Sequence, residues 1–148
     1  MFLSKYLILT DSPARGLLKK YEYIILAHYK KELNDWIIDL GCGDGAFSEA
    51  ALDGFQMIGT DLSKQQLDMA KRRKVYHSVV LADARLLPLR SFSVRTIISI
   101  SALEHIPELD RVFREIYRVL RRPGILLFTG PARALYNDAF FISQILNP

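Results

Sequence analysis

The sequence predicts an α/β protein in which a mainly parallel sheet is covered by helices on both faces. Between residues 36 and 129, short apolar runs alternate with amphipathic stretches, a pattern typical of parallel strands joined by helices. The 148 residues, 50% hydrophobic and 24% charged, have the size and composition of one folded domain. We therefore predict a single domain over residues 1–148, with a helical lead at 1–33, a core at 34–131 and a C-terminal helix at 132–148.

The lead segment predicts an amphipathic helix over residues 13–33. Its apolar side chains recur at helical spacing, at Leu17, Leu18, Tyr21, Ile24, Ile25 and Tyr29. Apolar helical stripes usually pack against a core, so packing on the sheet is one interpretation of this face. The other is that its tyrosines line a substrate pocket.

Five apolar runs are predicted to form the strands, at residues 36–40, 55–60, 78–81, 96–101 and 125–129. After the second run, Ser63 and Gln66 form a capping box that starts a helix, and the basic run at 71–74 ends it. A further amphipathic helix is predicted at 135–146.

The helix before the fifth strand has signals at both ends. Pro107 suits its first position, where the missing amide hydrogen costs no hydrogen bond. Arg118, Arg121 and Arg122 are expected to end it, because cations are favourable at a helix C-terminus. Pro123-Gly124 then predicts a turn into the strand.

Cysteine and histidine content limits the cofactors. The chain has one cysteine, Cys42, and three histidines, which excludes an internal disulfide and leaves no familiar zinc-ligand spacing. We expect no metal and a cytoplasmic location. No apolar run reaches the ~20 residues needed to cross a bilayer, so we expect no membrane span.

The net charge of +4 is unevenly placed: residues 71–95 hold seven Lys or Arg residues and one acid, Asp83. Such a patch suits an anionic substrate or a nucleic acid. Four of these bases form the run at 71–74, at an expected helix end, which favours a solvated helix terminus. No aromatic RNA-binding motif accompanies them, and we expect no nucleic-acid partner.

The strongest chemical signal is the glycine-rich loop that follows the first predicted strand, in the run WIIDLGCGDGAFSEA at 36–50. Gly41, Gly43 and Gly45 fall within five residues, and glycines are useful where a backbone approaches a ligand closely. Gly41, Gly43 and Ala46 also fit the G-x-G-x-x-A dinucleotide fingerprint, with Asp61 twenty residues after Gly41.

Charge separates the candidate cofactors. Asp39 and Asp44 flank the glycines and would repel the pyrophosphate of a dinucleotide, which binds such a loop through its negative charge. A ligand with an ammonium, a sulfonium and no phosphate would be attracted instead, and its ribose hydroxyls could donate to Asp61. S-adenosylmethionine fits this description. Asp44 alternatively caps the following helix.

Five motifs, in order and spacing, make residues 34–131 resemble the class I S-adenosylmethionine-dependent methyltransferases, within the broad type-11 group that includes ubiquinone and menaquinone biosynthesis methyltransferases. They are DLGCGDG at 39–45, GTDLS at 59–63, ADARLLPL at 82–89, ISALEHIP at 100–107 and RVFREIYRVLRRPGILLFT at 111–129. The resemblance implies a three-layer Rossmann-like sandwich with strand order 3-2-1-4-5 and, in the family, two further strands. These strands 6 and 7 are missing from our prediction, so we expect a C-terminally truncated chain.

The resemblance also implies the site. It assigns the methionine end of the cofactor to the loop of Asp39, Gly41, Cys42 and Gly43, and the two ribose hydroxyls to Asp61, which Leu62 follows. It assigns the adenine amino group to Asp83, beside Ala84. Two further cofactor residues are expected at the end of the fourth strand, Ser99 and Ser101.

His105 is the candidate catalytic residue, as a general base. Its alternative role is to orient the helix that follows. Methyl transfer from an activated sulfonium needs alignment in a dry site more than it needs a base. Two departures from the family pattern are Val94-Arg95, where the family has Phe and Asp, and Arg122-Pro123-Gly124, where it has Pro-Gly-Gly. An arginine near the cofactor would change the charge of the site.

The leading hypothesis is a methyltransferase that converts S-adenosylmethionine to S-adenosylhomocysteine by direct displacement onto a small-molecule or lipid-like acceptor. The alternatives are an inactive or incomplete cofactor-binding scaffold of the same fold and an NAD-dependent oxidoreductase. If strands 6 and 7 are absent, the apolar fifth strand becomes an exposed edge, which predicts a homodimer through that edge.

Overall fold

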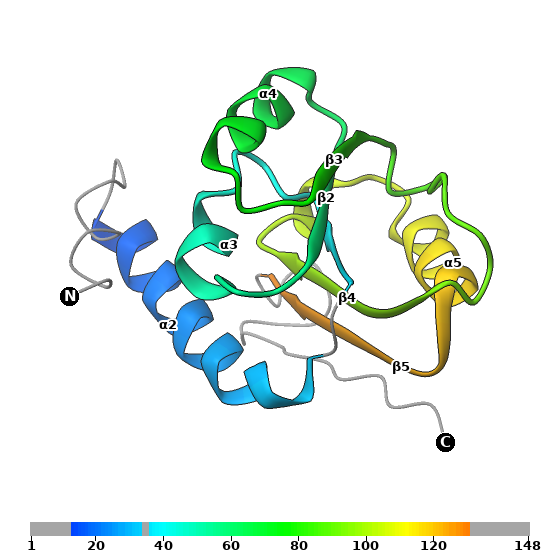
Figure 1. Cartoon of the computed structure of the whole chain (residues 1–148), viewed down its shortest axis with the longest axis horizontal. Helices are drawn as coiled ribbons and strands as arrows, with labels where there is room; N and C mark the ends of the chain where they lie inside the picture. The colour runs from blue at the N-terminus through cyan, green and yellow to red at the C-terminus, as the bar shows by residue number, and fades with distance from the viewer. Residues whose placement is uncertain (1–12, 34–35, 131–148) are drawn as a thin grey trace.

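The computed structural model describes residues 13–33 and 36–130, and the helix predicted at 135–146 lies outside them. Figure 1 shows the elements in chain order. They are α2 (Pro13–Tyr29), the short helix η1 (Lys30–Glu32), β1 (Ile37–Leu40), α3 (Ala46–Ala51), β2 (Met57–Asp61), α4 (Lys64–Arg73), β3 (Ser78–Leu81), β4 (Val94–Ile100), η2 (Leu103–His105), α5 (Leu109–Val119) and β5 (Leu120–Thr129).

The five described strands form one sheet in the order β3-β2-β1-β4-β5, as predicted. Every pair in it is parallel. In the central strand β1, Ile38 pairs with Ile58 on one side and Ile97 on the other. Because all strands run the same way, their carboxyl ends meet at one edge, where open α/β sheets bind ligands.

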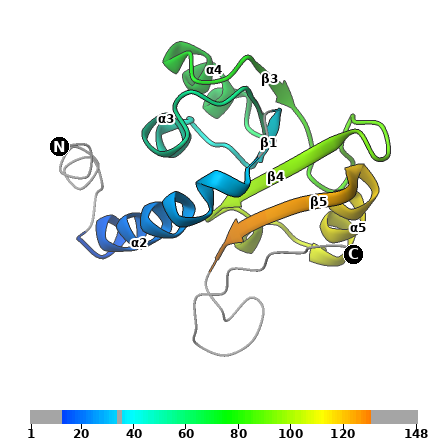
Figure 2. The ribbon, with the colours of Figure 1, turned by 60° about the horizontal axis from the view of Figure 1, so that its bottom comes forward.

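Helices cover both faces of this sheet, which gives the predicted three layers. Adjacent residues of β1 point to opposite faces. Ile38 joins a core cluster with Val112 and Ile116 of α5, whereas Ile37 joins a second cluster with Leu26 of α2. Figures 1 and 2 show α5 on one side of the strands and α2 on the other.

The capping prediction for α4 is confirmed in part: Ser63 is the N-cap, but its backbone N–H donates to Asp61 Oδ1 and not to the Gln66 side chain that a capping box requires. The backbone amide of Gln66 donates to the Ser63 hydroxyl at 3.3 Å, and the helix ends at Arg73 within the basic run. Lys74 follows it with a left-handed backbone, a common way to end a helix. This helix occupies the crossover from β2 to β3.

Two predictions around α5 are wrong. Pro107 precedes the helix, which starts at Leu109, because Glu108 adopts a left-handed backbone and interrupts the turn. Pro123-Gly124 is not a turn before the strand: β5 already begins at Leu120, which pairs with Val94, and pairing resumes at Ile125 with Thr96. The intervening residues form an irregularity within β5, so Arg121 and Arg122 belong to the strand and not to the helix end.

The predicted inner face of α2 is partly wrong. Leu17, Tyr21 and Ile24 are 51%, 58% and 49% exposed. Leu26 and Glu22 are each 1% exposed instead. The helix is therefore turned so that the acidic side chain of Glu22 faces the sheet. The tyrosines are absent from the lining of the cavity described next; Tyr23 and Tyr29 pack on the second core cluster.

None of the helices within residues 13–33 and 36–130 combines the length and apolar character required to cross a membrane.

Candidate cofactor site

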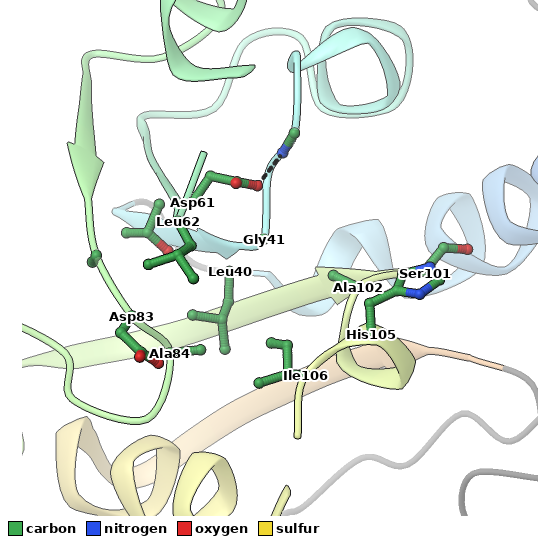
Figure 3. Close-up of a pocket in the computed structure, with 13 residues that line it drawn as sticks. Leu40, Gly41, Asp61, Leu62, Asp83, Ala84, Ser101, Ala102, His105 and Ile106 are labelled. Carbon is green, nitrogen blue, oxygen red and sulfur yellow. Dashed lines mark hydrogen bonds between the residues drawn. The ribbon is translucent and has the colours of Figure 1, made fainter. Parts of the chain in front are cut away.

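A cavity of about 350 Å³ opens at the carboxyl ends of the central strands (Figure 3). Its volume is in the range of small-molecule sites. The loops after β1, β2, β3 and β4 supply its lining, which consists of Leu40, Gly41, Gly43, Thr60, Asp61, Leu62, Ala82, Asp83, Ala84, Ser101, Ala102, His105 and Ile106. Eight of the predicted site residues therefore lie together: Gly41, Gly43, Asp61, Leu62, Asp83, Ala84, Ser101 and His105.

Asp61, the last residue of β2, is held by two backbone amides. Gly43 N–H donates to its Oδ2 at 2.9 Å, the contact dashed in Figure 3, and Ser63 N–H donates to its Oδ1 at 2.8 Å. A carboxylate has about four acceptor positions, so each oxygen keeps one for a ligand. The glycine loop thus orients the acid that faces the cavity.

The glycine loop lies directly against the segment that follows β4. Gly41 has a φ of +74°, and a Cβ atom there would lie 2.5 Å from the Ala102 Cβ. The loop is tied to β2 by the amides of Gly41 and Cys42, which both donate to the Thr60 carbonyl, at 2.8 and 3.0 Å. Glycine is therefore required at position 41 for both its backbone conformation and its lack of a side chain.

Asp39 lies behind the loop and outside the cavity lining. It is 3% exposed, and its Oδ2 accepts from Ser48 Oγ at 2.5 Å and from Tyr76 Oη at 2.6 Å. Burial raises the pKa of the Asp39 carboxyl, although both hydrogen bonds oppose the rise. The side chain supports the loop from behind through Ser48 and Tyr76.

Cys42 and Ser99, also predicted as site residues, lie outside the lining too. Burial raises the pKa of the Cys42 thiol, with the neighbouring Asp39 and Asp61 carboxylates adding to the rise. Ser99 is fully buried, and its hydroxyl donates to the Leu40 carbonyl at 2.8 Å, which links β4 to β1.

Asp44 is paired with a cation that the sequence did not reveal. Arg73 at the end of α4 donates to Asp44 Oδ2 at 2.6 Å, to the Asp44 carbonyl at 2.9 Å and to Glu49 Oε2 at 2.8 Å. The other Asp44 oxygen accepts from Ala46 N–H at 3.1 Å, at the start of α3. Gly45, and not Asp44, is the N-cap of α3, so the predicted capping role of Asp44 is wrong. Asp44 lies one residue earlier, where its carboxylate is already paired with Arg73.

Asp83 carries its own cation as well. The Arg85 guanidinium donates to both Asp83 oxygens, with a shortest contact of 2.7 Å, and lowers the pKa of that carboxyl to about 2. Arg85 also donates to Glu108 Oε1 at 2.7 Å. Asp83 is therefore ionised, and it forms part of one wall of the cavity. Arg85 connects it to Glu108, which joins the loop after β3 to the start of α5.

His105, in the short helix η2, lines the cavity from the loop after β4. Its side chain is 78% exposed, and its Nε2 lies 4.0 Å from Glu104 Oε1. In Figure 3 it lies at the same end of the cavity as Ser101 and Ala102. The histidine is thus accessible to a second substrate.

Arg95 corrects an expectation about charge. It is the second residue of β4, and it is exposed at the amino end of that strand. The cavity lies at the carboxyl ends of the parallel strands. The arginine is therefore at the opposite edge of the sheet and does not change the charge of the cavity.

Sequence reasoning missed three residues that support the site: Glu22, Arg73 and Tyr76. The only signal for Glu22 was an acid placed among the apolar positions of the lead helix. No sequence signal pointed to Tyr76. Its ring would lie 2.8 Å from a Cβ added at Gly45 and 3.3 Å from a Cβ added at Gly59.

This fold and site define a Rossmann-like α/β protein: a parallel sheet in the order 3-2-1-4-5, a glycine loop after β1 and an acid at the end of β2. Residues 38–128 match the family model described as "Methyltransferase domain". The chain therefore belongs to the S-adenosylmethionine-dependent methyltransferase family.

A curated relative is named as a methyltransferase, and two solved structures are similar in fold. A malonyl-[acyl-carrier protein] O-methyltransferase of Hamiltonella defensa is 30% identical over 117 residues, which are 78% of this chain and 45% of that protein. The chain thus spans less than half of that relative. A crystal structure from Pyrococcus horikoshii OT3 has a TM-score of 0.67 and 27% identity, and covers 86% of this chain and 59% of its own. The [4+2]-cyclase SpnF has a TM-score of 0.64 and 26% identity, over 74% and 44% of the two chains.

Proposed function

We propose that the cavity binds S-adenosylmethionine and that the protein transfers its methyl group by direct displacement to a small-molecule or lipid-like acceptor. The observation that carries the proposal is the Asp61 carboxylate, fixed by Gly43 and Ser63 amides at the cavity wall with acceptor positions left over. Vicinal ribose hydroxyls supply the matching donors.

The described residues fit this cofactor. A Cβ at Gly43 would meet nothing nearer than Gln66 Oε1 at 3.9 Å, so the loop backbone is open to a ligand. We assign the ribose hydroxyls to Asp61, with Leu62 and Ala84 as apolar contacts beside it, and the adenine amino group to Asp83. We assign the methionine end to the backbone of Gly41 and Gly43 and to Ser101.

The bound cofactor supplies a methyl carbon activated by a positively charged sulfur. The protein's task is then to hold the acceptor in line with that methyl and to exclude water, and alignment of this kind is worth several kcal/mol. We assign the acceptor to the end of the cavity at Ser101 and His105. His105 is our candidate base for acceptors that must lose a proton.

Calorimetry with S-adenosylhomocysteine, the reaction product, tests the cofactor assignment. Asp61→Ala removes the acceptor of two charge-assisted hydrogen bonds and is expected to weaken binding roughly a hundredfold. Asp53→Ala, at an exposed position after α3, is the matched control and should leave binding unchanged. No binding by the unaltered protein, or equal binding by Asp61→Ala, refutes the assignment.

The acceptor is proposed from the relatives. The Hamiltonella protein is named for O-methylation of a malonyl group on acyl-carrier protein, which supports a carboxylate on an acyl chain as the first acceptor class to test. Mass spectrometry of malonyl thioesters, fatty acids and quinol-type phenols incubated with S-adenosylmethionine would rank them. Efficient methylation of a highly charged small metabolite in preference to all of these overturns the lipid-like part of the proposal.

A second candidate is a protein that binds the cofactor without transferring its methyl group. The similarity to a structure named as a [4+2]-cyclase favours it, because this fold supports more than one reaction. Tight S-adenosylhomocysteine binding without methylation of any acceptor would support this candidate. The NAD-dependent alternative is tested by heat stability: protection by NADH and not by S-adenosylhomocysteine would revive it.

We also propose a homodimer and a cytoplasmic location. β5 is an edge strand of the described sheet, and an unpaired edge is a template for a second chain. Light scattering tests the first point: a monomer at all concentrations refutes pairing through β5.

A further inference from the structure

We propose that Glu22 is a positioning residue that makes the Ser101 end of the cavity selective for a ligand carrying an ammonium group. This inference rests on the proposed function, because the methionine end of S-adenosylmethionine and of S-adenosylhomocysteine carries such a group. It goes beyond that function by assigning the selectivity to the lead helix, which lies outside the matched family domain at 38–128.

Glu22 connects α2 to the carboxyl ends of two strands. Its Oε1 accepts from Thr129 Oγ1 at 2.6 Å, at the end of β5, and from the hydroxyl of Ser101, which follows β4. Lys19 Nζ lies 2.9 Å from its Oε2. Two hydroxyls donate to Oε1 and a cation lies beside Oε2, so the geometry suits an ionised carboxylate.

This carboxylate occupies a position where an apolar residue would be the simpler solution. Glu22 is 1% exposed, and Leu26 one turn later packs in the second core cluster. Burial of an ion is costly, and replacement of a buried polar cluster by apolar residues is often neutral or stabilising. Anchoring of the helix alone therefore does not explain a glutamate here, whereas a role toward the cavity does.

The hydrogen bond to Glu22 limits what the Ser101 hydroxyl can offer a ligand. A serine hydroxyl has one hydrogen and two acceptor lone pairs, and in Ser101 the hydrogen is directed to Glu22. Ser101 also lines the cavity, so its oxygen can offer a ligand only acceptor positions. Its φ of +50° is unusual for a serine, and the Thr129 hydroxyl, which accepts from Ser101 N–H at 3.1 Å, holds it there.

The charged side chains named around this end are two carboxylates and one ammonium group. Glu104 lies three residues after Ser101, and its Oε2 is buried without a hydrogen-bond partner among the described residues. Two carboxylates, Glu22 and Glu104, thus stand near this end, and Lys19 is the cation paired with Glu22. A cation in the cavity is favoured there over a neutral or anionic group.

The test compares two ligands that differ in the ammonium-bearing tail. S-adenosylhomocysteine and 5′-methylthioadenosine share the nucleoside and the thioether, and only the first carries the amino-acid group. We expect Glu22→Gln to weaken S-adenosylhomocysteine about tenfold in calorimetry and to change 5′-methylthioadenosine less than twofold. Lys20→Gln, at an exposed position of the same helix, should change neither. Ser101→Ala should discriminate as Glu22→Gln does, and serves if Glu22→Gln does not fold.

The outcomes separate the two proposals. Equal weakening of both ligands by Glu22→Gln means that the residue only anchors α2, and unchanged binding of both means that it does not act on the cavity. Either result overturns this inference and leaves the proposed function intact. If the unaltered protein binds neither ligand, the cofactor assignment fails, and the inference fails with it.

Discussion

Arg73 links the glycine loop to α3 and α4, and we call this set of contacts the clamp. The loss of stability expected when Arg73 is removed follows from these contacts. The guanidinium joins α4 to the Asp44 side chain and carbonyl and to Glu49 on α3. The Arg73 and Asp44 side chains are each 32% exposed and that of Glu49 is 48% exposed, so solvent screens both ion pairs. We assign each pair about 0.5 kcal/mol and the bond to the carbonyl about 1 kcal/mol.

Arg73→Ala is therefore expected to lower the free energy of unfolding by about 2 kcal/mol, which corresponds to roughly 4–8 °C in Tm for a domain of this size. Urea denaturation at low and at 1 M salt is the assay, and the difference from the unaltered protein should shrink at high salt. Because the clamp fixes Asp44 next to Gly43, S-adenosylhomocysteine affinity should also fall severalfold. Arg72→Ala, an exposed neighbour, is the control.

Either of two results would contradict a stabilising clamp at Arg73. One is a loss of unfolding free energy below about 0.5 kcal/mol, the value expected for an ordinary surface ion pair. The other is a loss equal to that of Arg72→Ala. A loss of about 2 kcal/mol with unchanged ligand affinity would confine Arg73 to stability.

Two further predictions concern His105 and Asp39. His105→Ala should lower kcat about a hundredfold for a hydroxyl acceptor, which must lose a proton, and less than threefold for a carboxylate, which is already ionised at neutral pH. Steady-state kinetics with both acceptors checks this, and equal losses would exclude a general base. Because burial raises the pKa of Asp39 above its ordinary 3.8, ionisation opposes folding, so native stability should fall as pH rises from about 4. The Asp39→Asn variant should lack this drop. Urea denaturation at a series of pH values should therefore show that the variant becomes more stable relative to the unaltered protein as pH rises. A difference in unfolding free energy that stays constant with pH contradicts the burial of an ionisable Asp39.

The strands and their order were predictable because parallel strands buried on both faces are short apolar runs, and five motifs set their sequence. The predictions that were wrong concern the ends of helices and strands. Pro123-Gly124 is a strong turn signal, but the ladder between β4 and β5 resumes beyond it, so the pair became an irregularity inside one strand. Local turn chemistry could not reveal this, because the pairing depends on residues about 25 positions away.

The site was predictable where backbone loops alone build it. Asp61 and Asp83 follow strands whose ends meet at one edge, so their proximity follows from topology. Asp39 differs because alternation along β1 sends it to the face opposite Ile38, toward Ser48 and Tyr76. Glu22 was unpredictable, since a charged residue in an amphipathic helix usually lies in solvent, and its partners are 79 and 107 residues away.

The charges that favour a sulfonium cofactor over a pyrophosphate do not come from Asp39 and Asp44, which flank the glycines. Asp39 is buried behind the loop, and Asp44 is paired with Arg73. In their place, the Asp61 carboxylate faces the cavity and accepts from two backbone amides, and Glu22 accepts from the Ser101 hydroxyl. A pyrophosphate at this loop would meet Asp61 at close range, whereas ribose hydroxyls and an ammonium would find acceptors at both ends of the cavity. We therefore propose that the end of β2 and the lead helix select the cofactor together, and the Glu22 and Asp61 variants are to be measured with the same ligands.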